Sequence, residues 1–198
     1  MERNVGMKRW TAGVMLVVCL GSTTFTGCNK EKQGLVPAKS GSLGSLTGSA
    51  AGVKWGVPQR WVAQGDRPMR VATYTIPAAE GDAESAECGV FYFGGGQGGD
   101  VEGNISRWVG QFEASGAPVR AEKQVGGMKI TSVQINGAFL VPSGPMMQSS
   151  GKKENFRLLG AIVEGPQGSV FFKLTGPART VTAAEGEFGA LVESIATM

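Results

Sequence analysis

The sequence contains no histidine, and only three of its 198 residues are cysteine. The lack of histidine removes the Ser–His and Cys–His pairs of nucleophilic catalysis, together with the commonest protein ligand of transition metals. The three cysteines are Cys19, Cys28 and Cys88. If the first leaves with a signal peptide and the second is modified, as argued below, Cys88 has no partner for a disulfide within the chain. We therefore expect Cys88, at the start of an apolar run, to be a buried free thiol.

Charged residues make up only 18% of the chain, with 19 Lys and Arg against 16 Asp and Glu. Residues 1–27 contain three of the basic residues and one of the acidic ones, so residues 28–198 carry 16 basic and 15 acidic side chains. There is no stripe of positive charge of the kind that nucleic-acid binding requires. We expect no nucleic-acid partner.

No apolar run near the N-terminus is long enough to cross a bilayer as a helix, which needs about 20 residues. The first residues instead have the three parts of a secretory signal. A basic region with Arg3, Lys8 and Arg9 precedes an apolar run over residues 12–20, and small and polar residues follow. Met1 and Met7 are both suitable starts for this segment. We expect residues 1–27 to be a signal peptide rather than a membrane-spanning anchor.

The signal ends in Phe25-Thr26-Gly27-Cys28, which resembles the lipobox of bacterial lipoproteins. In that family the cysteine thiol receives a diacylglycerol, the chain is cut before the cysteine, and the new amino group is usually acylated. Phe25 stands where the family usually has Leu, and the alternative is an ordinary signal peptide followed by an unmodified cysteine. The resemblance implies lipidation of Cys28, and two or three acyl chains anchor a protein stably to a membrane. Asn29 in place of Asp resembles lipoproteins on the periplasmic face of the outer membrane rather than the inner membrane.

Residues 28–52 combine the modified cysteine with a run rich in Ser, Gly and Ala. Such a composition is typical of a flexible coil, so we predict a tether here. Residues 53–198 are numerous enough to bury a core, and they contain neither a repeat nor a second linker. We predict one domain over this range.

Strand patterns recur through that domain. The sequence predicts strands over 69–76, 87–93 and 138–141, and hairpins formed by 119–125 with 128–135 and by 156–164 with 169–175. Gly126-Gly127 suits the turn of the first hairpin because glycine readily adopts positive φ angles. A polar loop is predicted over 142–155.

Two helices are also expected. Asp100 is a candidate N-cap, and the residues behind it recur at helical spacing: Val101, Ile105, Trp108 and Phe112. A last helix opens at Gly176-Pro177, with the apolar stripe Val181, Ala184, Phe188, Leu191 and Ile195. These elements predict an α+β fold, a mostly antiparallel sheet packed with two amphipathic helices.

The domain resembles the Mog/PsbP-like sandwich and small lipoproteins of environmental bacteria. The resemblance rests on Trp55-Gly-Val-Pro58-Gln-Arg-Trp61, on a helix after a glycine-rich turn, and on Phe171-Phe172-Lys173-Leu174-Thr175-Gly176-Pro177 before the closing helix. Members of that fold mostly bind or organise partners, so the resemblance implies binding rather than catalysis, although a fold does not fix a function. We expect the two tryptophans to pack half-buried, with one as a candidate exposed anchor.

The glycine-rich segment Gly94, Gly95, Gly96, Gln97, Gly98 and Gly99 matches the G-x-G-x-x-G pattern of dinucleotide-binding loops. Asp100 argues against a phosphate here, since its carboxylate takes the helix amides that a phosphate needs. The following hairpin also lacks the second crossover of such a domain. We predict no cofactor, and we retain this loop as a possible contact surface.

Other candidate sites have weaker patterns. Asp82, Glu84 and Glu87 could attract a hard cation but lack the spacing of a calcium loop, and Met146-Met147 without histidine is a poor copper site. Ser149 with Lys152, and Ser150 with Lys153, match the S-x-x-K spacing of penicillin-binding enzymes without their other motifs. We predict no metal and no catalytic residues.

The sequence thus favours a lipid-anchored, non-enzymatic domain that binds a protein or another cell-envelope component. The alternative is a small-ligand binder or hydrolase that uses carboxylates, Lys or Ser in the loops 94–99 and 142–155. These two hypotheses differ in geometry, because the alternative requires a deep pocket with convergent polar side chains at those loops.

Overall fold

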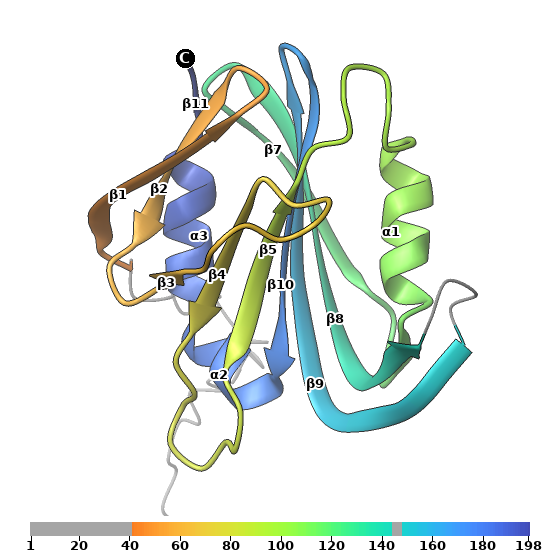
Figure 1. The fold of residues 1–198 in the computed structure, drawn as a ribbon. Helices are drawn as coiled ribbons and strands as arrows, with labels where there is room; N and C mark the ends of the chain where they lie inside the picture. Colours follow the sequence, from red (N-terminus) through yellow and green to blue (C-terminus); the bar gives the residue numbers. More distant parts are fainter. Residues whose placement is uncertain (1–40, 144–147) are drawn as a thin grey trace, which may run out of the picture. The chain divides into compact units, whose positions relative to one another are not determined.

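The computed structural model describes residues 41–143 and 148–198, and the side chains of residues 142–150 are outside this description. The strands are β1 (Leu43–Ala50), β2 (Val53–Pro58), β3 (Val62–Ala63), β4 (Ala72–Ile76), β5 (Ala86–Phe91), β6 (Phe112–Ala114), β7 (Val119–Val125), β8 (Met128–Ser143), β9 (Gln148–Gly165), β10 (Gly168–Pro177) and β11 (Ala196–Thr197). The helices are α1 (Val101–Val109), α2 (Ala178–Ala183) and α3 (Glu185–Glu193). The predicted α+β class is confirmed (Figure 1).

The larger sheet has the order β3-β4-β5-β10-β9-β8-β6, and β7 also pairs with β8. Its pairs are antiparallel. Both predicted hairpins are confirmed, and Gly126 and Gly127 adopt φ angles of 55° and 78° at the turn between β7 and β8. The predicted strand at 69–76 starts later, at Ala72, because Met69 has a positive φ of 64° in the preceding turn.

The polar loop predicted over 142–155 is largely wrong. β8 continues to Ser143 and β9 starts at Gln148, with Leu140 paired to Lys152. The backbone ladder satisfies the amides and carbonyls of these residues whatever their side chains are. Residues 151–155 are exposed, so their polar composition reflects a solvated end of the strand pair rather than a loop.

The smaller sheet has the order β1-β2-β11 and overturns part of the predicted tether. Residues 43–50, placed in the flexible segment 28–52, form β1 and pair with β2. A Cβ at Gly48 would lie 2.4 Å from the indole of Trp55, its partner across the strands. The small residues of β1 therefore allow its backbone to lie against a large ring. The same small residues give this segment the composition of a flexible linker, which is why the sequence predicts a tether there.

The helix ends follow local chemistry. The Asp100 side chain accepts a hydrogen bond from Gly103 N at 2.6 Å, which confirms the predicted cap of α1. Phe112, predicted on this helix, instead begins β6, because α1 ends at Gly110 and the chain turns into the sheet. The predicted last helix is two helices, α2 and α3, that meet at Ala184.

Apolar side chains cover both faces of the larger sheet. On one face, residues of α2, α3 and the smaller sheet pack against β4, β5, β9 and β10, and all five residues of the predicted stripe 181–195 are buried there. On the other face, Ile105 and Trp108 of α1 pack on Leu158, Ile162 and Phe171. Figure 1 shows α1 and α3 on opposite sides of this sheet. The alternation of β9 explains this, since successive strand residues point to opposite faces.

Candidate functional site

A pocket of about 630 Å³ lies between α3 and the strands β7, β8 and β9. Leu159 of β9 and Phe188 and Val192 of α3 give it an apolar lining. Gly186, Gly189 and Ala190 of α3 also line it, and a Cβ built at Gly189 would meet no atom within 4 Å. The small residues of α3 thus leave space that larger side chains would fill. Its volume falls in the range of about 300–1,000 Å³ that is usual for small-molecule sites.

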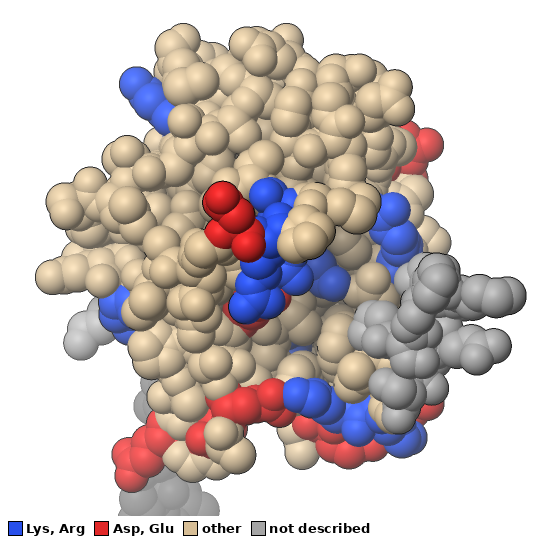
Figure 2. Space-filling model, viewed as in Figure 1, with Lys and Arg blue, Asp and Glu red and all other residues tan. Residues whose placement is uncertain are grey.

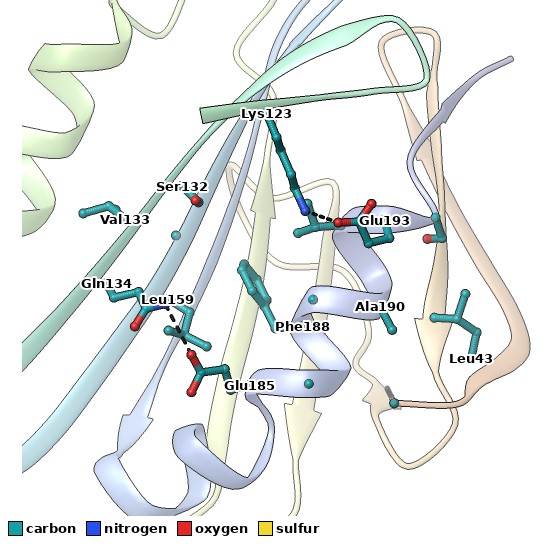
Figure 3. A pocket seen from close by; sticks show the side chains of 16 residues that line it. Leu43, Lys123, Ser132, Val133, Gln134, Leu159, Glu185, Phe188, Ala190 and Glu193 are labelled. Carbon is teal, nitrogen blue, oxygen red and sulfur yellow. Dashed lines mark hydrogen bonds and ion pairs between the residues drawn. The ribbon is translucent and has the colours of Figure 1, made fainter. Parts of the chain in front are cut away.

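Two polar contacts join the sheet to the helix at the rim of this pocket (Figure 3). Lys123 Nζ of β7 donates to Glu193 Oε1 of α3, and Gln134 Nε2 of β8 donates to Glu185 Oε1 at 3.3 Å. Leu159 and Phe188 lie between them in this view. Because each polar group already has a protein partner, the region between the two contacts offers an apolar rather than a polar surface.

The buried side chain of Arg157 on β9 stabilises the contact between Gln134 and Glu185, because it binds both residues. Its Nη1 donates to Glu185 Oε2 at 2.9 Å and to Thr182 Oγ1 at 3.0 Å, and its Nη2 donates to Gln134 Oε1 at 2.7 Å. This network fixes the start of α3 against β8 and β9. One end of the pocket is therefore held by charge-assisted hydrogen bonds, which are stronger than neutral ones.

Sequence reasoning missed this pocket. Its residues come from 41 to 43, from three strands and from α3, and none belongs to a motif. The one available signal is the set of small residues Gly186, Gly189 and Ala190, which lie between the apolar positions of the predicted stripe.

The glycine-rich loop 94–99 does not line this pocket. Four of its glycines, Gly94, Gly96, Gly98 and Gly99, have positive φ angles between 70° and 105°. Asn104 Nδ2 donates to Gly98 O and to Asp100 O, both at 2.8 Å. Asp100 occupies an amide of the first turn of α1, in agreement with the argument against a phosphate there. The use of the loop as a contact surface stays a prediction.

The carboxylates of the 82–87 segment do not converge. Asp82 accepts hydrogen bonds from Thr180 N and Thr180 Oγ1, at 2.9 and 2.6 Å. Glu84 pairs with Lys153, and Glu87 pairs with Arg70 at 2.6 Å and Arg67 at 3.2 Å. These acidic residues are partnered rather than simply solvated. Within 41–143 and 148–198, no group of three His, Cys, Asp or Glu side chains is arranged to hold a metal ion.

The lysines of the S-x-x-K matches are also engaged in ion pairs. Lys152 pairs with Glu113 at 2.9 Å, and the hydrogen bond and charge of Glu113 raise the pKa of Lys152. A general base needs the opposite shift. Both lysines lie on strand β9 instead of the helix start that those enzymes use.

Two expectations about single residues are resolved by burial. Cys88 is fully buried and free, and burial raises the pKa of its thiol, which agrees with an inert core residue. Trp55 and Trp61 are both buried rather than half-exposed. Trp55 Nε1 donates to Tyr74 Oη at 3.1 Å, and Trp61 Nε1 donates to Glu187 Oε2 at 2.8 Å. Neither tryptophan is an exposed anchor.

Cys28, the signal segment and Met146-Met147 lie outside the described residues. In the part of the chain that the structure does describe, no helix has both the length and the hydropathy to span a bilayer.

No family model and no curated protein matches this sequence. Among solved structures, the chain is similar to that of a cyanobacterial PsbP, CyanoP from Synechocystis sp. PCC 6803. The two share 12% identity with a TM-score of 0.46, over 80% of this chain and 98% of the other.

Proposed function

We propose that this protein is a lipid-anchored component of a bacterial cell envelope, held at Cys28, whose domain binds another envelope component without chemical turnover. The observation that carries the binding role is the apolar pocket between α3 and β7–β9. Most of a small-molecule site is usually apolar, with few polar groups at its edge. This pocket has that character.

The pocket favours a ligand with a hydrocarbon portion, such as an acyl chain. Charged groups at its rim are already paired within the protein, in Lys123–Glu193 and in Arg157–Glu185. A strongly charged ligand would have to displace these pairs. An apolar chain instead gains about 25 cal/mol for each Å² that it removes from water, and leaves the pairs intact.

Binding rather than hydrolysis is supported by the state of the candidate catalytic groups. Glu84, Glu87 and Lys152 are each held in an ion pair, and Asp82 is bound to Thr180 at the start of α2. A general acid or base needs a proton-exchanging group with access to a substrate. Of these side chains, only Lys152 lies in the loops 94–99 and 142–155 of the hydrolase alternative, and its ion pair with Glu113 disfavours a role as a general base.

Gly189 offers a direct test of the pocket. Gly189 lines the pocket and a Cβ built there meets no atom within 4 Å, so Gly189→Leu is expected to add a side chain to the pocket lining. We expect this variant to bind the fluorescent fatty acid 11-(dansylamino)undecanoate at least tenfold more weakly than the unsubstituted chain. Gly189→Ala is the matched control and should bind nearly as well. Equal probe affinity for the Leu and Ala variants would exclude this pocket as the site.

The anchor is tested separately. Mass spectrometry of the mature N-terminus should find an acylated Cys28, and Cys28→Ser should release the protein from the membrane fraction. An unmodified chain that begins elsewhere would disprove lipid anchoring and leave the pocket test unaffected. Separation of inner and outer membranes would place the protein on one of them.

A further inference from the structure

Lys173 lies at the centre of an unusual row of residues on the α1 face of the larger sheet. Across the strands it pairs with Gly89 of β5 on one side and with Gly160 of β9 on the other. Neither glycine has a side chain, so side chains from other parts of the chain occupy the space on either side of Lys173. A Cβ at Gly160 would lie 2.4 Å from Trp108 of α1, and one at Gly89 would lie 3.5 Å from Arg70 Nη1.

This arrangement brings cationic groups together from three elements. Lys173 comes from β10, Arg107 from α1 just before Trp108, and Arg70 from the segment before β4. Burial of the Lys173 amine, and then the positive charges of Arg70 and Arg107, lower its pKa to about 8 against the opposing charge of Glu87. Figure 2 shows Lys and Arg side chains gathered near the centre of the view, with acidic side chains beside them. We call Arg70, Arg107 and Lys173 the basic cluster.

Negative charge at the basic cluster is scarce. Glu87 binds Arg70 at 2.6 Å and is shared with Arg67, which is 48% exposed. Within the described residues, no carboxylate forms an ion pair with Lys173 or Arg107. The Lys173 amine donates to Gln111 Oε1, and Arg107 Nη2 donates to Asn104 Oδ1. The three cations and Glu87 leave an excess of two positive charges.

Aromatic rings hold two of these cations without neutralising them. Lys173 Nζ lies 5.8 Å from the centre of the Phe139 ring, and the Arg70 guanidinium lies 5.4 Å from that of Phe91. An ammonium has three donors and a guanidinium has five. Within the described residues, the side-chain hydrogen bonds from these three cations go to Glu87, Thr73, Gln111 and Asn104, which are fewer acceptors than the cations have donors.

We infer that the basic cluster binds a phosphate-type oxyanion. Arginine forks match the paired oxygens of phosphate, and lysine binds phosphate as a point charge. A phosphate monoester carries about −1.5 to −2 charges at pH 7, which matches the local excess better than the single charge of a carboxylate or a phosphodiester does. The source would be a free phosphate monoester or the phosphodiester of a lipid headgroup. This site lies on the face of the sheet opposite α3 and is independent of the apolar pocket.

The test is titration of the full chain, purified as its host makes it, with three small probes at pH 7. Inorganic phosphate represents the free monoester, dimethyl phosphate the lipid diester, and acetate a carboxylate. Calorimetry gives the affinities. We expect saturable binding of one of the two phosphates, with acetate at least tenfold weaker, and the preferred phosphate identifies the source. Absence of saturable phosphate binding, or equal binding of acetate, would overturn the assignment.

Two variants localise the site. Lys173→Met should weaken phosphate binding at least tenfold. Arg107→Gln removes a second cation of the cluster, and because Arg107 is exposed on α1, this change leaves the residues of the sheet unaltered. Lys54→Met, on the exposed side of β2 in the smaller sheet, is the control and should leave the affinity unchanged. The affinity of the unsubstituted chain should also fall between pH 7 and pH 10.5, because binding requires the charged amine. If Arg107→Gln, once shown to be folded, bound phosphate as well as Lys54→Met does, the basic cluster would not be the site.

Discussion

Arg157 of β9 and Glu185 of α3 are joined by a hydrogen-bonded ion pair of 2.9 Å, in which the arginine side chain is only 10% exposed. The pair ties the first turn of α3 to the centre of the larger sheet. Gln134, at one end of the pocket, is hydrogen-bonded to both residues of this pair. The shape of the pocket therefore depends on a contact between residues 28 positions apart in the sequence.

Replacement of Arg157 should be costly. Arg157→Met removes the hydrogen bonds to Thr182, Glu185 and Gln134 and leaves a partly buried carboxylate without its cation. We expect a loss of about 2–4 kcal/mol in the free energy of unfolding, measured with urea. Arg157→Met with Glu185→Gln should recover part of the loss, since no unpaired charge remains. If the double variant were less stable than the single one, the charge would not be the cause.

The packing of α1 on the sheet can be tested at Gly160. In Gly160→Ala the new methyl group would lie 2.4 Å from Trp108 Cζ3, so the helix has to move. Overpacking of this kind typically costs about 1–3 kcal/mol in unfolding free energy. Gly116→Ala is a control, because a Cβ at Gly116 meets nothing within 4 Å. Similar melting temperatures for the two variants would contradict the close approach of Trp108.

Trp55 and Tyr74 form a buried hydrogen bond of 3.1 Å that links the two sheets. Trp55→Phe and Tyr74→Phe should each lower the unfolding free energy, by about 1–3 kcal/mol, because each leaves a polar group unpaired. The Trp55 change also loses ring volume beside Phe172. A double-mutant cycle measured by urea unfolding should give a coupling energy above about 0.5 kcal/mol. Strict additivity would show that the bond contributes nothing.

The amine of Lys173 predicts a pH dependence of stability. Its pKa in the folded chain is about 8, against an ordinary value of 10.5. Between these values the unfolded chain binds a proton that the folded chain does not, so stability from this group rises with pH. Over that interval the gain is roughly 3 kcal/mol. It is absent below pH 8, where both states carry the charge.

Lys173→Met isolates this effect. In phosphate-free buffer, the stability of the variant relative to the unsubstituted chain should fall by that amount between pH 7 and pH 10.5. Other groups, such as the buried Cys88 thiol, titrate in both proteins and cancel in the difference. A difference that does not change with pH would disprove the lowered pKa of Lys173.

Much of the local structure was predictable because its causes are local. Gly126-Gly127 sets a turn through its own φ angles, Asp100 caps the helix that follows it, and the stripe from Val181 to Ile195 predicts a buried helical face. The ends of helices and strands were predicted wrongly where they depend on pairing with a strand that is distant in the sequence. The end of α1 before Phe112 and the extension of β9 through residues 148–155 depend on pairing with β8.

The candidate sites show the same division. The carboxylates of 82–87 resemble a cation loop in sequence, but their partners Thr180, Lys153 and Arg70 come from separate parts of the fold. The pocket and the basic cluster have no sequence motif, because each gathers residues from elements that are far apart in the sequence. Small residues such as Gly89, Gly160 and Gly189 mark these places only once their neighbours are known.

The sequence alone determined that the chain has no histidine, and therefore no Ser–His or Cys–His pair, and that Cys88 is its single cysteine after residue 28. It also determined the lipobox-like motif at Cys28 and the antiparallel α+β character of the domain. Only the tertiary structure decided that residues 43–50 are a strand, and that Lys173 lies between two glycines of the neighbouring strands. The physical reason is that composition and periodicity report the preferences of one segment, whereas close approach and charge excess arise between segments that meet only on folding.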